Sequence, residues 1–408
     1  MGTTEGADGV GEKVARTVPY KGKHLILGID GTWQAAFRDI FQSNVYRMNL
    51  ALNYEDKTAD RKAQIFIYSA GVGTANRSSQ MIAGATGEGL AAIILEAYIN
   101  IVANYVPGDK IYIFGFSRGA FAARALSGMI SHAGLLKANS SSLIEHAWRF
   151  FTGEKQEVAY EQLVADNTYQ DVQIEFLGVW DTVSGPYKKE QLQRKYRFDN
   201  LMLDRCVKHG VHIVSIDDSR GDYSPIPWEG FHPHQTMDQV WMPGVHGDVG
   251  GGYEDACLST ISLLMMIDKL AEYCPDLWFD DKYIEDTLIR IVDQQKIVVN
   301  DERIGFWRYF GRSIARKIEQ DVLHRHVQHP LVDLLRDKTI KFKRSQRPYV
   351  PSFYIPKDNK LNLAILGSSS WHARRLLSIL TTKFPAALPP NPPPPGGENS
   401  PPGACVRK

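Results

Sequence analysis

The feature that most constrains the fold of this chain is the pentapeptide Gly-Phe-Ser-Arg-Gly at residues 115–119. The apolar run 110–114 precedes it, and an alanine-rich segment follows it. A serine at a sharp corner between a strand and a helix is lifted out of the edge of a sheet, and side chains in place of Gly115 and Gly119 would collide with neighbouring backbone. The pattern predicts that Ser117 is a nucleophile. The alternative is a chance match, because short patterns of this kind recur in glycine-rich loops.

Short apolar or β-branched runs alternate with longer helical patterns, which is typical of a sheet built from β–α–β units. Several of the runs are apolar almost continuously, which indicates strands that are buried on both faces. We predict an α/β fold of the α/β-hydrolase type, with a mostly parallel central sheet, helices on both faces and a helical cap or C-terminal extension. The predicted strands are 24–29, 64–68, 110–114, 172–180, 211–216 and 239–242, and the predicted helices are 88–106, 118–134 and 141–152.

Partners for the serine are expected further along the chain, in the order acid and then histidine, on loops at the carboxyl ends of strands. Asp181 directly follows the strand 172–180, and His246 follows the strand 239–242 on a glycine-rich loop. A serine hydroxyl becomes a good nucleophile when an imidazole accepts its proton, and the imidazole needs a carboxylate to fix its tautomer. We therefore predict a catalytic triad of Ser117, Asp181 and His246.

Other residues compete for these roles. Asp181 could only end a strand in a turn, and His246 could be an ordinary loop histidine. Asp248 is too close in sequence to orient His246 easily, and we expect it to support the loop. The remaining candidates are Asp217 and Asp218 as acids and His212, His232 and His234 as bases.

An oxyanion hole needs backbone N–H groups that point at the developing negative charge. The N–H of Arg118, at the start of the helix, is the first expected donor. The turn after the first strand offers Gly31 and Thr32 for the second, while Asp30 either caps this turn or binds a ligand. The side chain of Arg118 either contacts an anionic substrate or ties neighbouring loops together.

The nearly equal numbers of positive and negative residues argue against nucleic acid as a partner. Lysine and arginine total 47 against 46 for aspartate and glutamate, so no overall electrostatic field favours binding to nucleic acid.

The cysteines are far apart and form no metal-binding cluster, so we expect no disulfide framework, no metal and no cofactor. No apolar run reaches the roughly 18 to 20 residues that a membrane-spanning helix needs. The four cysteines are Cys206, Cys257, Cys274 and Cys405.

We expect three parts along the chain. Residues 1–20 are polar and predict a disordered leader, residues 21–384 predict a single hydrolase domain with helical insertions, and residues 385–408 are proline-rich and predict a disordered tail. The leader lacks the apolar centre of a signal peptide, which favours a cytoplasmic protein or export by a specialised secretion system.

Six segments together are more specific than the serine motif alone. In this order they resemble the DUF2235 family of hydrolases, which includes the catalytic domain of Tle1-class type VI secretion phospholipase effectors. The resemblance covers about residues 22–355 and implies an α/β-hydrolase fold, the triad of Ser117, Asp181 and His246, and phospholipase activity. The segments are 30–32, 71–74, 84–90, 115–120, 179–183 and 246–253, with Arg347-Pro-Tyr349 as a closing motif.

Residues 303–318 place apolar side chains at helical spacing among basic ones. This predicts an amphipathic helix that either packs on the core or lies against lipid as a lid, which would give peripheral membrane contact. The sequence thus predicts a serine hydrolase that cleaves carboxylic esters, with a lipid as substrate. The alternatives are a hydrolase of a small soluble ester, thioester or amide, and a catalytically silent binding module.

Overall fold

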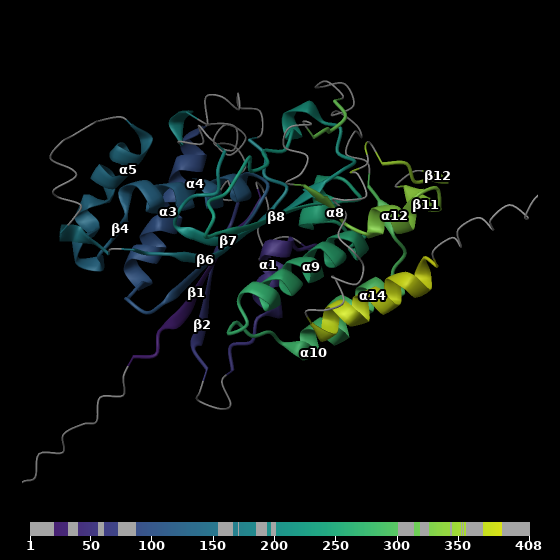
Figure 1. The fold of residues 1–408 in the computed structure, drawn as a ribbon, viewed down its shortest axis with the longest axis horizontal. Coiled ribbons are helices and arrows are strands. Elements are labelled where there is room, and N and C mark those ends of the chain that lie inside the picture. The colour runs from purple at the N-terminus through teal and green to yellow at the C-terminus, as the bar shows by residue number, and fades with distance from the viewer. Residues whose placement is uncertain are drawn as a thin grey trace, which may run out of the picture.

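The computed structural model describes residues 20–31, 40–55, 61–71, 87–153, 166–169, 171–184, 194–196, 201–300, 314–318, 326–342, 345–351, 353, 355 and 370–385. Figure 1 shows how their helices and strands are arranged. The predicted leader apart from Tyr20, and the predicted proline-rich tail apart from Pro385, lie outside these residues.

A seven-stranded sheet forms the centre of the molecule, and each pair of neighbouring strands in it is parallel. This confirms the predicted α/β fold, and the six predicted strands all belong to this sheet. The order is β10-β8-β7-β6-β3-β1-β2. The bounds are β1 Lys23–Ile29, β2 Ala63–Ser69, β3 Lys110–Phe116, β6 Ile174–Trp180, β7 Val207–Ser215, β8 Thr236–Met242 and β10 Val327–Gln328.

Helices cover both faces of the sheet (Figure 1). Each layer encloses its own cluster of buried apolar side chains, so both faces of the strands are removed from water. The predicted helices are found on one side as α3 (Gly87–Asn104), α4 (Arg118–Ala133) and α5 (Ile144–Thr152). The other side has α1 (Asn44–Ala51) and α9 (Cys257–Tyr273), with the C-terminal helix α14 (Trp371–Lys383) packed on α9.

The strand order reverses between β1 and β3, because β2 lies outside β1 whereas β6, β7 and β8 follow on the other side of β3. At such a point the loops at the carboxyl ends of the strands diverge and leave a crevice for a ligand. Asp30 follows β1 and Ser117 follows β3 at this point, and Asp181 and His246 come after β6 and β8 at the same edge. The fold thus gathers the predicted site residues at one edge of the sheet.

Smaller elements complete the described part. A three-stranded sheet has the order β12-β11-β9, and β4 pairs with β5. These elements are β4 Leu135–Leu136, β5 Thr168–Tyr169, β9 Val298–Val299, β11 Thr339–Phe342, β12 Ser345–Pro348, η1 Ala138–Leu143, η2 Gly221–Tyr223, α8 His246–Gly250, α10 Asp281–Tyr283, η3 Ile284–Ile289, α11 Arg290–Gln294 and α12 Leu331–Leu335.

The amphipathic helix predicted at 303–318 is not found where it can be tested. Residues 314–318 are not helical, and residues 303–313 lie outside the described part of the chain. Burial at the end of this segment is opposite to the predicted amphipathic pattern, because Ile314 is 49% exposed whereas Arg316 is buried.

No helix in the described ranges is both long enough and apolar enough to span a membrane.

Candidate active site

Ser117 forms the corner between β3 and α4. Its backbone has φ 60° and ψ −124°, a strained conformation that residues with side chains seldom adopt. A Cβ atom on Gly119 would lie 2.2 Å from the carbonyl oxygen of Ile29, and one on Gly115 would lie 2.6 Å from that of Gly119. Both positions therefore require glycine, as the sequence predicted. The N–H of Ser117 donates to the carbonyl of Trp180 at 3.0 Å, which joins the corner to the end of β6.

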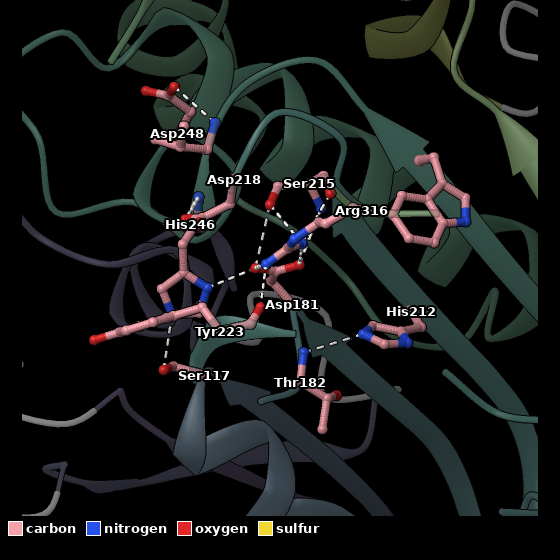
Figure 2. A network of polar contacts seen from close by, with 12 residues as sticks. Ser117, Asp181, Thr182, His212, Ser215, Asp218, Tyr223, His246, Asp248 and Arg316 are labelled. Carbon is pink, nitrogen blue, oxygen red and sulfur yellow. Dashed lines mark hydrogen bonds and ion pairs between the residues drawn. The ribbon is translucent and has the colours of Figure 1, made fainter. Parts of the chain in front are cut away.

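Two successive polar contacts connect Ser117 to His246 and His246 to Asp181 (Figure 2). His246 Nε2 is 2.8 Å from Ser117 Oγ, and His246 Nδ1 is 2.6 Å from Asp181 Oδ2. The serine and histidine are 7% exposed, and the aspartate is fully buried. The structure thus brings together the three residues that the sequence singled out, from the ends of three different strands.

His246 begins the short helix α8, so the prediction that it lies on a loop was wrong. Asp248 Oδ2 accepts the N–H of Val245 at 3.0 Å, which satisfies a backbone group at the start of the helix. The imidazole ring lies beside Phe116, with ring centres 4.7 Å apart, and Tyr223 packs edge-on against it at 5.1 Å. These aromatic contacts restrict rotation of the ring.

The Asp181 carboxylate is held by several donors besides His246. Arg316 Nη1 donates to Oδ1 at 2.6 Å and Nη2 to Oδ2 at 2.9 Å. Ser215 adds its N–H to Oδ1 at 3.0 Å and its hydroxyl to Oδ2 at 3.2 Å. Burial alone would raise the pKa of this carboxyl, but the charge of Arg316 and the hydrogen bond from His246 hold the pKa well below its ordinary value. Asp181 is therefore ionised throughout the physiological range.

Sequence reasoning missed the contact between Arg316 and Asp181. The two residues are 135 positions apart, and Arg316 was only one of several basic residues in the segment predicted to be amphipathic. Arg316 is 6% exposed, and its guanidinium also donates to the carbonyl oxygens of Ser215 and Tyr223. Nothing in the spacing of the sequence distinguishes it from its exposed neighbour Lys317.

The competing carboxylates bind backbone N–H groups instead of the imidazole. Asp218 Oδ2 accepts the N–H of His246 at 3.2 Å, and Asp217 Oδ2 accepts that of Gly244 at 2.7 Å. Asp217 also accepts the hydroxyl of Tyr349, in the closing motif, at 2.9 Å.

Asp248 supports α8, in agreement with the loop-support role expected from the sequence. In addition to the N–H of Val245, it accepts the backbone N–H of Asn300 at 3.0 Å and the side-chain amide at 2.7 Å. Burial raises the pKa of Asp248 to about 7, although these hydrogen bonds oppose the shift.

The competing histidines lie away from Ser117 Oγ. His212 is buried within β7, and its Nε2 accepts the N–H of Thr182 at 3.1 Å, directly after Asp181. Burial lowers the pKa of His212 to about 3, so it is neutral. His232 and His234 stack on each other before β8 begins, at the opposite edge of the sheet from the site.

Asp30 organises the turn after β1. Its carboxylate caps this turn, which is one of the two roles expected from the sequence. Asp30 Oδ1 accepts the N–H of Gly31 at 2.7 Å, and Oδ2 accepts the hydroxyls of Ser43 at 2.6 Å and Tyr68 at 2.7 Å. A Cβ atom on Gly31 would lie 3.4 Å from that of Ser117, so this backbone does reach the nucleophile. Its N–H donates to Asp30 Oδ1, and the oxyanion role expected of Gly31 stays a prediction.

The other two expected oxyanion donors are Thr32 and Arg118. Thr32 lies outside the described residues. Arg118 is the first residue of α4, where N–H groups have no acceptor within the helix and the helix dipole favours negative charge.

Within the described ranges, no group of three or more histidine, cysteine, aspartate or glutamate side chains could hold a metal ion.

A family model and three known proteins match parts of this chain. The model of the family described as "T6SS, Phospholipase effector Tle1-like, catalytic domain" matches residues 23–269, which is more than half of the chain. An uncharacterized protein of Saccharomyces cerevisiae, YEL023C, is 29% identical over 237 residues, which are 51% of this chain and 33% of the yeast protein.

Two solved structures are also similar, both at 19% identity. One is an uncharacterized protein from Pseudomonas aeruginosa, with a TM-score of 0.37, where the match covers 63% of this chain and 47% of that one. The other is the Tle1 effector bound to the VgrG spike of the type VI secretion system, with a TM-score of 0.36 and coverage of 58% and 52%. The match thus spans between a third and about half of the length of these three proteins.

Proposed function

Because this chain belongs to the family of Tle1-like type VI secretion phospholipase effectors, which it matches in their catalytic domain, we propose that it is a serine hydrolase that cleaves carboxylic esters of phospholipids. The observation that carries the mechanism is the chain of contacts from Ser117 Oγ through His246 to Asp181, at 2.8 and 2.6 Å. The phospholipid substrate rests on the family alone.

In the first half of the proposed reaction, Ser117 Oγ attacks the ester carbonyl while His246 Nε2 accepts the hydroxyl proton. The tetrahedral intermediate then collapses, and the departing alcohol takes that proton from His246. An acyl group remains bonded to Ser117. In the second half, His246 removes a proton from water as the water attacks the acyl carbonyl, and returns this proton to Ser117 as the fatty acid leaves.

Three features of the site support these steps. Asp181 is ionised and fixes the proton of the neutral imidazole on Nδ1, which leaves Nε2 to accept from serine. The N-terminal end of α4 faces the nucleophile, and we assign the N–H of Arg118 as one oxyanion donor. The strained corner holds Ser117 Oγ at the sheet edge, so little reorganisation is needed for attack.

A fluorophosphonate probe tests the nucleophile. The wild-type protein and a Ser142→Ala variant, which alters an exposed serine, should both be labelled, whereas Ser117→Ala should not. Absence of labelling in the wild type under all conditions would contradict the proposal and favour a catalytically silent binding module.

A panel of phospholipids in vesicles, with the products identified by mass spectrometry, tests the substrate. We expect release of fatty acid by the wild type and none by Ser117→Ala. Labelling by the probe together with hydrolysis of only small soluble esters, thioesters or amides would refute the lipid assignment while leaving the serine mechanism in place.

A further inference from the structure

Residues 314–318, which we call the strap, lie against the loops that follow β6 and β7. The N–H of Ile314 donates to the carbonyl of Ser219 at 2.9 Å, and Ile318 packs against the main apolar core. Between them, Arg316 is buried whereas Ala315 and Lys317 are exposed. The strap is thus anchored at both ends, with a single cation directed into the protein.

Arg316 binds groups on two sides of His246 (Figure 2). On one side its fork contacts both carboxylate oxygens of Asp181, a geometry that resists rotation of the carboxylate. On the other side, Nη2 donates to the carbonyl of Tyr223 at 2.7 Å, and the ring of Tyr223 packs edge-on against the imidazole. The Arg316 guanidinium therefore fixes both Asp181, which accepts from His246 Nδ1, and Tyr223, whose ring packs against the imidazole.

The charge of Arg316 also matters, because the site is buried. Asp218 is paired with Arg220 at 2.7 Å, so the Asp181 carboxylate would be the uncompensated charge beside His246 if Arg316 were absent. The charge of Arg316 holds down the pKa of the Asp181 carboxyl, so the acceptor of His246 Nδ1 stays ionised although it is buried. The charged and titratable groups facing this region, within the described residues, are Asp181, Asp218, Arg220, Tyr223, Asp248, Arg316 and, beneath Asp181, His212.

We propose that Arg316 is a positioning residue of the serine-hydrolase site: it holds Asp181 and Tyr223 around His246, so that the imidazole stays aimed at Ser117 Oγ. This inference rests on the proposed function. It assigns a role in the reaction to a part of the chain far from the three triad residues in sequence.

The test compares pH profiles of kcat/KM for Arg316→Gln, Arg316→Lys and the matched control Lys317→Gln, which removes an exposed cation from the same strap. For Arg316→Gln we expect kcat to fall on the order of 100-fold, because the triad is misplaced. We also expect the acidic limb to move to higher pH, because the cation that holds down the pKa of the Asp181 carboxyl is removed.

Arg316→Lys separates charge from geometry. Lysine keeps the positive charge but cannot form the fork, so kcat should fall while the acidic limb stays close to that of the wild type. Lys317→Gln should change neither. An acidic limb of Arg316→Gln that coincides with the wild-type limb would overturn the proposal, since a purely structural arginine would lower activity at every pH alike.

A second readout needs no turnover. In the Ser117→Ala background, NMR should show a low-field signal for the His246 Nδ1 proton that is bound to Asp181, and this signal should weaken or shift in Arg316→Gln but not in Lys317→Gln. If the wild type cleaves no ester, the proposed function fails, but this signal still decides whether Arg316 holds Asp181 against the imidazole. If Arg316→Gln does not fold, Arg316→Lys carries the test, and wild-type kcat in that variant would refute the positioning role.

Discussion

Replacing Asp181 with asparagine gives the most direct test of the proposed triad. The carboxylate accepts hydrogen bonds at both oxygens, and Arg316 and the N–H of Ser215 can only donate. An amide NH₂ in place of Oδ1 would face two such donors. The side chain is therefore expected to turn its NH₂ toward the position of Oδ2, next to His246.

In that arrangement His246 Nδ1 must become the acceptor, and the ring proton moves to Nε2. Nε2 then donates to Ser117 Oγ and cannot accept its proton. The wrong tautomer of a catalytic histidine costs about 10⁴-fold in kcat in a serine protease, which corresponds to about 5.5 kcal/mol of barrier. The variant also leaves Arg316 buried without its counter-charge, so the free energy of unfolding should fall by about 3–5 kcal/mol.

The assay is hydrolysis of a chromogenic ester by folded protein, with urea unfolding of the same preparation to measure stability. Asp218→Asn is the matched control, because Asp218 contacts the backbone N–H of His246 but not its ring. If Asp181→Asn kept activity within about tenfold of the wild type while Asp218→Asn lost more, the acid would have to be reassigned to Asp218.

Three further predictions follow from the same region. His246→Ala should lower kcat on the order of 10⁶-fold, measured with the same ester, and substantial residual activity would exclude His246 as the base. The pKa of Asp248 is raised to about 7, so the folded state binds more protons than the unfolded state between about pH 4 and pH 7. Its contribution to the free energy of unfolding should therefore decrease as the pH rises through this range, and Asp248→Asn should remove that slope in urea titrations; an unchanged slope would contradict the shift. Gly119→Ala should reduce the free energy of unfolding by about 3 kcal/mol, because its Cβ would lie 2.2 Å from the Ile29 carbonyl, whereas Gly128→Ala in the same helix meets only ordinary contacts at 3.4 Å and should not destabilise.

The sequence was informative where a local pattern determines local structure. The apolar strand, the glycines around Ser117 and the alanine-rich helix are contiguous, so the corner at residue 117 could be predicted with its neighbours. Asp181 could be placed at a strand end for the same reason. The parallel sheet then explains why residues after β3, β6 and β8 meet at one edge, which residue spacing alone would not show.

The sequence was least informative where a contact depends on tertiary structure. Arg316 has no local feature that reveals its burial, and its position at Asp181 depends on a segment that returns to the site after more than a hundred residues. The sequence predicts a loop where α8 forms, because the four glycines between residues 247 and 252 have low helical propensity.

The hydrogen bond from the Ser117 N–H to the Trp180 carbonyl has a consequence for how the site can move. A second backbone bond, from the Val183 N–H to the Ser117 carbonyl at 3.5 Å, lies on the other side of Asp181, so serine and aspartate belong to one rigid unit. His246 enters from a separate element that is tethered through Asp218 and Asp248. A ligand or substitution that displaced α8 by a small distance would therefore inactivate the protein by withdrawing the base alone, and the reactive hydroxyl would remain in place.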